Sequence, residues 1–191
     1  MRLPTVLIAL LLVTASVSAA QQDKSKKPSP SAASCKFADG KTVTTDYSSP
    51  RMMGHKIFGG IVPYGEVWRV GNDQAATFVT DNDLSLADQD VPAGRYTLFA
   101  IPAADRWTLI ISKQTAQQDA HYSEGKDLLR VNMHVSKTPH PVENFTIAYE
   151  PKDGKCTLRM SWENTEAWVD VTEKKLCWPT TSPLTYQCPD Q

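Results

Sequence analysis

The sequence predicts a single all-β domain, either an antiparallel β-sandwich or a jelly-roll-like barrel of about nine strands. Short segments rich in β-branched and aromatic residues recur along the chain between turn-forming residues, which is typical of strands. No segment has the sustained 3.6-residue hydrophobic period of an amphipathic helix. The length left after the N-terminal region described below suits one domain.

Turn chemistry separates the expected strands. Pro92, Ala93 and Gly94 precede one strand, residues 103–105 connect two, and Asp153-Gly154 indicates a tight hairpin between two more. In order along the chain, the expected strands cover residues 41–47, 66–70, 75–80, 95–101, 107–112, 128–135, 142–150, 156–162 and 167–171.

Alternation along a strand assigns side chains to opposite faces. It predicts that Met133 faces the core and His134 faces solvent, and that Phe145 and Ile147 face the core. We interpret residues 162–165 (Trp-Glu-Asn-Thr) as a tight connection between two strands, with Asn at the position that tolerates a left-handed backbone.

The two ends of the chain differ in composition from the predicted domain. Residues 1–20 have Arg2, a short apolar run and small residues before Gln21, which predicts a cleaved signal peptide and a periplasmic or secreted protein without a transmembrane anchor. Residues 21–34 are too polar and rich in Pro and Ser to fold, so they are expected to form a disordered linker. The β domain is then expected at 35–173, followed by a Pro/Thr-rich tail at 174–191.

Four cysteines in an exported chain predict two disulfides. Three pairings are possible, and we favour Cys35 with Cys156 because both flank predicted strands. Cys177 and Cys188 would then close a small loop in the tail. The Cys and His spacings match no zinc motif, so neither a metal nor another cofactor is predicted.

The densest polar and aromatic cluster lies between residues 47 and 73. Arginine side chains form paired hydrogen bonds with anionic groups, and aromatic rings stack on sugars or cations. This cluster is therefore a candidate site for a small polar or carbohydrate-like ligand. The alternative is structural: the aromatic residues fill the core, and Arg69 pairs with Glu66 or Asp73. The candidate ligand-binding residues are Tyr47, Arg51, His55, Tyr64, Trp68, Arg69 and Asp73.

Charge and motif content limit the other function classes. The formal net charge is −1, so no global field attracts nucleic acid or an anionic membrane. No Gly-x-Ser-x-Gly elbow or Ser-x-x-Lys pair is present, so no catalytic residue is assigned and the sequence favours a protein that is not an enzyme. Nothing in the sequence indicates an oligomeric state.

Five motifs follow one another along the chain: Tyr-Ser-Ser-Pro-Arg at 47–51, Gly-His-Lys-Ile-Phe-Gly at 54–59, Val-Pro-Tyr-Gly-Glu-Val-Trp-Arg at 62–69, Pro-Ala-Gly-Arg-Tyr-Thr-Leu-Phe at 92–99 and Trp-Glu-Asn-Thr at 162–165. This ordered series resembles the bacterial domain-of-unknown-function family 2911. The resemblance covers roughly 35–172 and implies an exported β domain of bacterial envelopes without an assigned activity. One departure is Gln74, where the family usually has Glu.

Three functions follow as hypotheses. The first is an exported domain that binds a small polar ligand or an envelope component near residues 47–60 and 64–73. The second is a hydrolase or isomerase whose acid or base is Asp73, Asp119, His55 or His121, which would require two titratable groups in one pocket. The third is a structural or protein-partner module, which would carry an exposed apolar patch.

Overall fold

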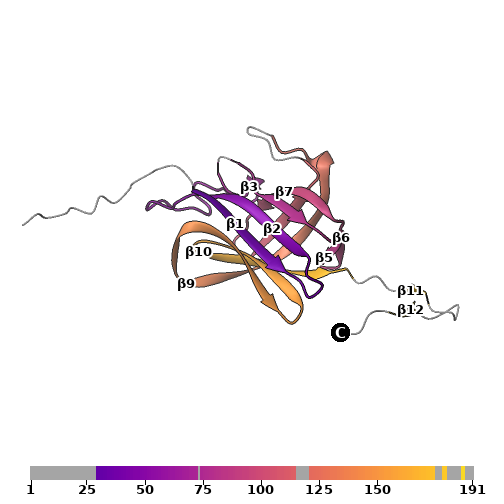
Figure 1. Cartoon of the computed structure of the whole chain (residues 1–191). Helices are drawn as coiled ribbons and strands as arrows, with labels where there is room; N and C mark the ends of the chain where they lie inside the picture. Colours follow the sequence, from indigo (N-terminus) through magenta and orange to yellow (C-terminus); the bar gives the residue numbers. More distant parts are fainter. Residues whose placement is uncertain (1–28, 73, 115–120, 175–177, 180–185, 188–191) are drawn as a thin grey trace, which may run out of the picture.

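The structure is a computed structural model that describes residues 29–72, 74–114, 121–174, 178–179 and 186–187. This part of the chain is almost entirely β, which confirms the predicted class (Figure 1). The elements are β1 (Ser29–Lys36), β2 (Thr42–Ser49), β3 (Trp68–Arg69), β4 (Thr77–Thr80), β5 (Leu84–Leu86), β6 (Gln89–Val91), β7 (Gly94–Ile101), β8 (Arg106–Ser112), the 3-10 turn η1 (Glu124–Lys126), β9 (Asp127–Lys152), β10 (Lys155–Glu173), β11 (Trp178–Pro179) and β12 (Tyr186–Gln187).

The first ten strands form one antiparallel sheet. Its order is β1-β2-β4-β7-β8-β9-β10-β5-β6, with β3 paired to β7 beside this path. The path ends at β1 and at β6, so the ladder is open and does not close into a barrel. A separate short ladder joins β11 to β12.

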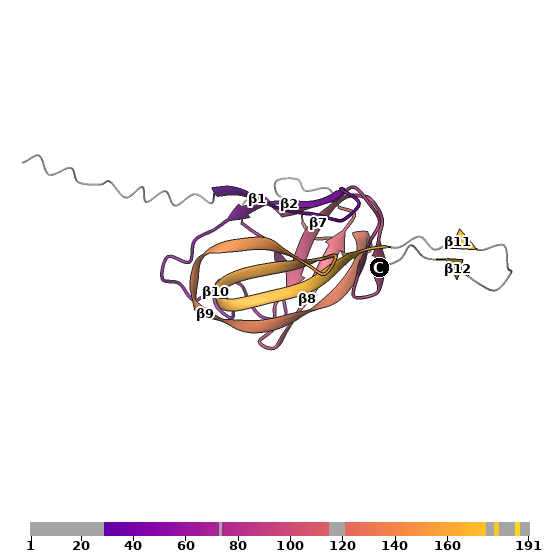
Figure 2. The same ribbon diagram turned by 60° about the horizontal axis from the view of Figure 1, so that its bottom comes forward.

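The sheet folds over itself, so that β1 and β2 face β9 and β10 (Figure 2). Side chains of β2 reach across to β9: Thr45 Oγ1 and the Tyr149 hydroxyl are 2.7 Å apart, and Ser49 Oγ donates to the Phe145 oxygen at 2.7 Å. A disulfide between Cys35 in β1 and Cys156 in β10 links the same two layers, with the Cα atoms 6.2 Å apart. This is the pairing that the sequence favoured.

The core lies between the facing halves of the sheet and follows the alternation of the strands. Met133, Phe145 and Ile147 are buried as predicted, and His134 is exposed. The largest fully buried side chains include Trp107, Phe78, Phe99, Phe145 and Ile57. The buried face of each strand therefore sets its register against its neighbours.

β9 and β10 are longer than expected, and each one joins two predicted strands into one. Asp153 and Gly154 both have positive φ, 50° and 73°, which gives the two-residue hairpin turn that Asp-Gly predicted. The β9–β10 ladder has irregularities between Ser161 and Glu163 and between Glu163 and Thr165. β-Bulges bend a strand without ending it, so alternation is interrupted there although the strand continues.

The interpretation of residues 162–165 as a strand connection is therefore wrong. These residues lie inside β10, and Glu163, not Asn164, has the left-handed backbone, with φ 56°. Such a conformation is unusual for Glu and persists where the surroundings hold it in place. The hydrogen bonds of the Glu163 carboxylate, described below, supply that restraint.

The linker prediction is wrong for residues 29–34, which belong to β1. This segment is made of small and polar residues and carries little strand propensity of its own. It pairs with the whole length of β2, from Ser29 opposite Ser49 to Lys36 opposite Thr42. Tertiary pairing and the disulfide therefore override local composition. The sequence also missed the short β5 and β6, which form a hairpin.

The predicted second disulfide concerns residues outside this description. Cys177 and Cys188, and with them the second disulfide, lie outside the described residues. Within the described part, no helix is long and apolar enough to cross a membrane.

Candidate functional site

Two of the predicted ligand-binding residues form part of the scaffold. The Tyr47 hydroxyl donates to the Ile147 oxygen at 3.3 Å, and its ring packs edge-on against Phe145 at a centroid distance of 5.7 Å. Trp68 is half-buried in β3 and contacts four other aromatic rings. The structural alternative thus describes Tyr47 and Trp68 better than ligand stacking does.

An aromatic cluster fills the core at the end of the molecule where β2 ends. Trp68 stacks on Trp162 at 6.2 Å, Phe58 packs edge-on against Trp107 at 4.8 Å, and Phe145 completes the cluster. The Trp162 indole donates to the Glu143 oxygen at 3.2 Å. The buried Trp107 Nε1 has no hydrogen-bond acceptor among the described residues. The cluster anchors the loop that follows β2.

Residues 50–67, here called the 50–67 loop, project at one end of the molecule, at the left in Figures 1 and 2. The Glu163 carboxylate fixes the centre of this loop, because one of its oxygens accepts from the amides of Ile57 and Phe58, each at 3.2 Å. Glu143 fixes the start of the loop: its backbone oxygen accepts from the Met52 amide at 2.7 Å, and its carboxylate accepts from the Met53 amide at 3.1 Å.

Turns inside the loop account for its glycines. The amides of Gly60 and Val62 both donate to the Ile57 oxygen, at 3.1 and 2.9 Å. Gly59 has φ +74°, and a Cβ there would lie 2.8 Å from Tyr64 Cε2. A Cβ on Gly60 would lie 2.3 Å from the Lys56 oxygen. The positive φ favours glycine at position 59, and the close approach of the Lys56 backbone oxygen requires it at position 60.

The loop has a buried face and an exposed face. Ile57, Phe58 and Val62 are buried at 0, 2 and 4 % exposure. On the other side, Met53, Ile61, Tyr64 and Val67 are 48, 59, 45 and 36 % exposed, and they are the exposed large hydrophobic residues of the described surface. The sequence did not predict that these apolar side chains gather on one loop.

The charged candidates lie around this apolar surface and contact protein groups. Arg51 forms a 3.5 Å ion pair with Glu143, while His55 is exposed. Arg69 donates to the Asn72 backbone oxygen at 3.2 Å, and among the described residues it forms no ion pair with Glu66, one of its two suggested partners. Asp73 lies outside the described residues. Arg51, His55 and Tyr64 thus lie on the projecting loop, while Tyr47, Trp68 and Arg69 lie in strands, and none of these candidates lines either of the two hollows described next.

One hollow, of about 290 Å³, lies on the outer face of β9 and β10. The half-buried Trp168 lines it, stacked on His134 at a centroid distance of 4.3 Å, with the Arg159 guanidinium 5.8 Å from its ring. Arg159 bonds to Glu150 at 2.8 Å and to Glu166 at 2.7 Å. The other residues around it are Lys152, Asp153, Lys155, Thr157 and Asp170.

The carboxyl group of Asp170, which lines this hollow, has a shifted pKa. Burial by itself would raise the pKa of Asp170, but the hydrogen bond from Thr157, the contact with Lys155 and the nearby His134 together hold it below its ordinary value. The Thr157 bond is 2.8 Å and the Lys155 contact 3.3 Å. Asp170 therefore stays ionised at neutral pH and at mildly acidic pH.

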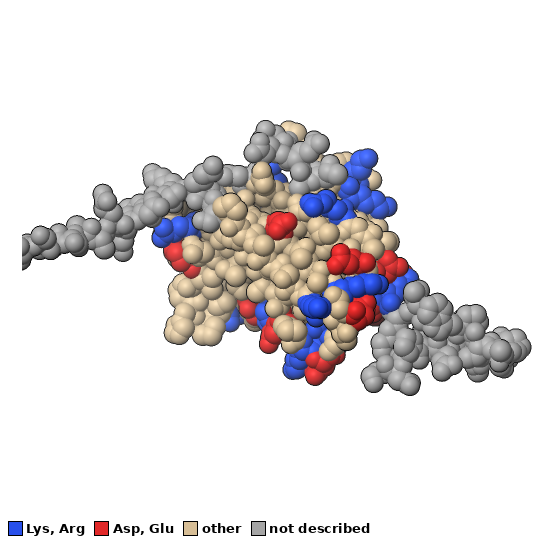
Figure 3. Space-filling view, in the orientation of Figure 1, with Lys and Arg blue, Asp and Glu red and all other residues tan. Residues whose placement is uncertain are grey.

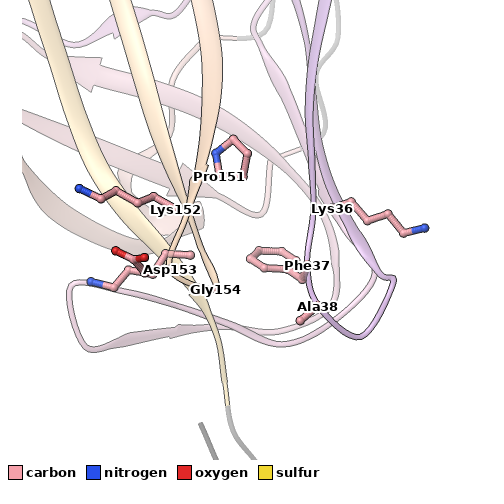
Figure 4. A pocket seen from close by; sticks show the side chains of 8 residues that line it. Lys36, Phe37, Ala38, Pro151, Lys152, Asp153 and Gly154 are labelled. Atoms are coloured by element: carbon pink, nitrogen blue, oxygen red, sulfur yellow. The ribbon is translucent and has the colours of Figure 1, made fainter.

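A second hollow, of about 250 Å³, separates the tip of the β1–β2 hairpin from the tip of the β9–β10 hairpin. Figure 4 shows the Phe37 ring pointing into this gap, towards Pro151, while the side chains of Lys36 and Lys152 point away. The gap lies next to the Cys35–Cys156 disulfide in the chain, and its polar groups do not converge. It is a packing gap between two hairpins.

The hydrolase or isomerase hypothesis gains no geometry from the described residues. Asp73 and Asp119 lie outside the described residues, so a site built from them with His55 or His121 stays a prediction. Within the described residues, no three His, Cys, Asp or Glu side chains are grouped as metal ligands. Gln74, the departure from the family pattern, is exposed.

Sequence reasoning missed Glu163, Glu143 and Trp168. Strand alternation holds the signal for Trp168, because Thr157, Arg159 and Ser161 lie on the outer face of β10 and Trp168 lies on that face beyond the bulges. A large aromatic residue among polar ones on a strand face is an identifiable anomaly. The anchoring role of Glu163 has no comparable signal, because its partners are backbone amides more than 100 positions away.

Comparisons with known proteins place this fold in a family. The family model described as protein of unknown function (DUF2911) matches residues 29–171, and the chain belongs to this family. The comparison with curated proteins found no match. The comparison with solved structures found none either.

Proposed function

We propose that this chain is an exported, periplasmic or secreted binding domain that attaches to a component of the cell envelope through the 50–67 loop. Two features support export. Residues 1–20 have the pattern of a cleaved leader, and the Cys35–Cys156 disulfide is typical of oxidising compartments. Family membership is consistent with this proposal and assigns no activity.

The exposed face of the loop is the observation that carries the proposal. Met53 and Ile61 are about half exposed, although the fold buries the other large apolar side chains of the described chain more deeply. Exposed apolar residues gathered on one element mark interaction sites. The buried face of the loop and its Glu163 anchor hold these side chains outward, so the unbound protein already presents the surface.

The predicted site residues divide into two roles in this proposal. Tyr64 provides contact area on the loop, with Arg51, His55 and Arg69 around it as donors to polar groups of the envelope component. Tyr47 and Trp68 hold the loop in position through the aromatic cluster. Asp73 is retained from the sequence prediction without a structural role.

Co-sedimentation with washed envelope fragments tests this proposal. The wild-type protein is compared with a Met53→Ser/Ile61→Ser variant, which removes apolar surface without touching a buried side chain. A Lys36→Gln/Lys41→Gln variant is the matched control. It changes exposed side chains at the β1–β2 hairpin tip, and the whole length of β2, roughly 23 Å at 3.3 Å per residue, separates this tip from the start of the loop.

The loop variant is expected to lose most of the sedimenting fraction, and the hairpin variant is expected to behave like wild type. Equal sedimentation of the wild-type protein and the loop variant would overturn the proposal. Thermal unfolding of both variants checks that the fold is retained, because exposed substitutions usually change stability by less than about 0.5 kcal/mol.

A second candidate function is the binding of a small polar, carbohydrate-like ligand over Trp168. The supporting observation is the combination of a half-buried indole with fixed charged donors and acceptors around a hollow of about 290 Å³. Ligand sites are concave and combine aromatic surface with a few oriented polar groups. Because Arg159 and Asp170 already have partners, a neutral ligand fits this hollow better than a charged one.

Thermal unfolding against a panel of envelope sugars tests this second candidate. A ligand present at about 100 times its dissociation constant stabilises the folded state by about 2.7 kcal/mol, which raises the midpoint by several degrees. The shift should vanish in Trp168→Ala and persist in Lys36→Gln, a change beside the other hollow. A panel without any shift, or a shift retained in Trp168→Ala, would remove this candidate.

A further inference from the structure

We infer that Met53 is a site of reversible oxidation, at which a peroxide converts the exposed face of the 50–67 loop from apolar to polar while the fold stays intact. The oxidation itself is independent of the proposed function, whereas its effect on binding to the envelope rests on that function. The basis is the exposure of Met53, the turn that holds it, and the lack of free thiols among the described residues.

The methionines of the described chain differ in their access to solvent. Met53 is 48 % exposed, whereas Met133 and Met160, on the buried faces of β9 and β10, are 1 and 0 % exposed. Met52 is half-buried and packs against the core. A small oxidant dissolved in water therefore reaches Met53 first, and the buried methionines provide a reference within the same protein.

A tight turn presents Met53 at the surface. Met53 and Gly54 both have positive φ, 50° and 78°, and the His55 amide donates to the Met52 oxygen at 2.9 Å, as in a type I′ turn. The Met53 amide donates to the Glu143 carboxylate at 3.1 Å, which fixes the turn to β9. Because the backbone is held by these bonds, Met53 stays at the surface.

The backbone does not explain the residue type at position 53. Asn, Asp and Gly are the usual residues where a type I′ turn requires positive φ, and a long side chain is uncommon there. Met53 is about half exposed, so burial does not compensate for the conformation. A residue held in a sparsely populated conformation at the surface indicates that its side chain is used. What methionine adds to other apolar side chains is a thioether that can be oxidised and reduced again.

The reaction needs no protein group other than the Met53 sulfur. A lone pair of this sulfur attacks one oxygen of hydrogen peroxide, the S–O bond forms as the O–O bond breaks, and the second oxygen leaves as water. The sulfur loses two electrons, and the peroxide gains them. Cys35 and Cys156 are joined in a disulfide and no cysteine of the described chain is free, so no thiol there consumes the peroxide first. A methionine sulfoxide reductase restores the thioether with two electrons from a dithiol and releases the oxygen as water.

Oxidation changes the binding surface and leaves the fold in place. Met53 shares its exposed face with Ile61, Tyr64 and Val67, and the sulfoxide places a polar group among these apolar side chains. The bonds that hold the turn come from the backbone and Glu143, so the modified sulfur takes no part in them. The apolar contact area of the loop is therefore expected to shrink while the position of the loop is kept.

Treatment with hydrogen peroxide followed by peptide mass spectrometry tests the order of oxidation. The sulfoxide should form at Met53 at least about tenfold faster than at Met133 and Met160, because oxidation follows exposure. Protein modified at Met53 should unfold at the same temperature as untreated protein, since exposed changes usually have little effect on stability. Oxidation of Met133 or Met160 as fast as Met53 would overturn the inference.

Hydrophobic-interaction chromatography measures the change of surface without any partner. In Figure 3 the charged side chains gather towards the β9–β10 hairpin and β5 and β6, whereas the exposed large hydrophobic residues of the described surface lie on the loop. Treated wild-type protein should elute earlier, and the reductase should restore its retention. Met53→Leu should keep its own retention after treatment. Met52→Leu, the matched control, retains Met53 and should shift like wild type. An unshifted wild-type protein, or an equal shift in Met53→Leu, would overturn the inference.

Co-sedimentation with untreated envelope fragments then measures the effect on binding, with each protein compared with itself before and after peroxide. Wild type and Met52→Leu should bind about fivefold more weakly after treatment, and Met53→Leu should show no such change. Binding that needs the loop but is unchanged by oxidation of Met53 would overturn the inference and leave the proposed function standing. If untreated protein failed to sediment while Met53 oxidised first and retention shifted, the proposed function would fall and the oxidation site would stand.

Discussion

Glu163 shows how one side chain can determine the shape of a distant loop. Its carboxylate accepts from the amides of Ile57 and Phe58, and its own backbone has the unfavourable φ of 56° at the bulge in β10. A left-handed conformation costs a non-glycine residue roughly 1–2 kcal/mol. The two hydrogen bonds to a charged acceptor offset that cost, since each contributes about 1.5–3 kcal/mol.

Replacing Glu163 with Ala should therefore destabilise the protein and loosen the 50–67 loop. The amides of the buried residues Ile57 and Phe58 lose their acceptor, and at about 1–3 kcal/mol for each unsatisfied donor we expect a loss of about 2–6 kcal/mol in the free energy of unfolding. Glu163→Gln keeps an acceptor oxygen and should lose less. Urea unfolding and hydrogen exchange at Ile57 and Phe58 measure the two effects. Unchanged exchange of these amides in Glu163→Ala would show that the carboxylate does not anchor the loop.

The lowered pKa of Asp170 leads us to predict that the stability of the fold depends on pH. Its pKa in the folded protein lies below the ordinary value of 3.8, because the Thr157 bond, the Lys155 contact and nearby His134 outweigh burial. A depressed carboxyl pKa stabilises the fold above the unfolded value and loses that contribution as the pH falls through the folded value. Asp170→Asn should thus cost stability at pH 7 and cost less at pH 2. Equal losses of unfolding free energy at both pH values would contradict this prediction.

The sequence predicted the candidate residues unevenly, for a physical reason. Local alternation placed Met133, His134, Phe145 and Ile147 on the correct faces because side-chain direction in a strand depends on the nearest residues alone. The roles of Tyr47 and Trp68 depend on which strands face each other, information that short segments do not contain. Aromatic and charged composition alone therefore suggested ligand contacts where the fold uses the aromatic rings as core.

At the scale of elements, the two faces of the 50–67 loop have different roles: the buried face stabilises the fold, and the exposed face is the one that we propose binds a partner. Phe58 is 2 % exposed and packs against Trp107, whereas Ile61, three residues later, is 59 % exposed. Phe58→Ala should lower the free energy of unfolding by about 3–5 kcal/mol. Ile61→Ser should change it by less than about 0.5 kcal/mol. Denaturant unfolding of both variants measures this contrast, and comparable losses would mean that the outer face of the loop is also structural.

Strands were predicted best where local chemistry determines them. Asp153-Gly154 specifies its own turn, so the hairpin between β9 and β10 was predicted correctly. β1 was missed because its eight residues gain their strand conformation only from β2 and the disulfide. The long β9 and β10 were each divided in two because the bulges near Glu163 interrupt alternation without ending the strand.

At the scale of the whole molecule, the Cys35–Cys156 disulfide joins the two layers of an open sheet. The layers otherwise meet through side chains and a few hydrogen bonds, such as the contact between Thr45 and Tyr149. Burial raises the pKa of the Tyr149 hydroxyl, so it stays protonated and can remain in that contact. The edge strand β1 pairs by its ladder with β2 alone, so the Cys35–Cys156 bond is what fixes it to β10.

The Cys35–Cys156 disulfide should accordingly contribute much of the stability of the domain. The two cysteines are 121 positions apart, and closing a loop of this size restricts the unfolded chain by about 4–5 kcal/mol in the chain-entropy model. Cys35→Ala/Cys156→Ala should lower the free energy of unfolding by an amount of this order, measured by urea unfolding. Cys177→Ala/Cys188→Ala is the matched control, because it removes the other two cysteines and leaves the link between the layers in place. If the Cys35→Ala/Cys156→Ala protein lost less than about 1 kcal/mol, the packing between β1–β2 and β9–β10 would hold the layers by itself, and the link would be dispensable for the fold.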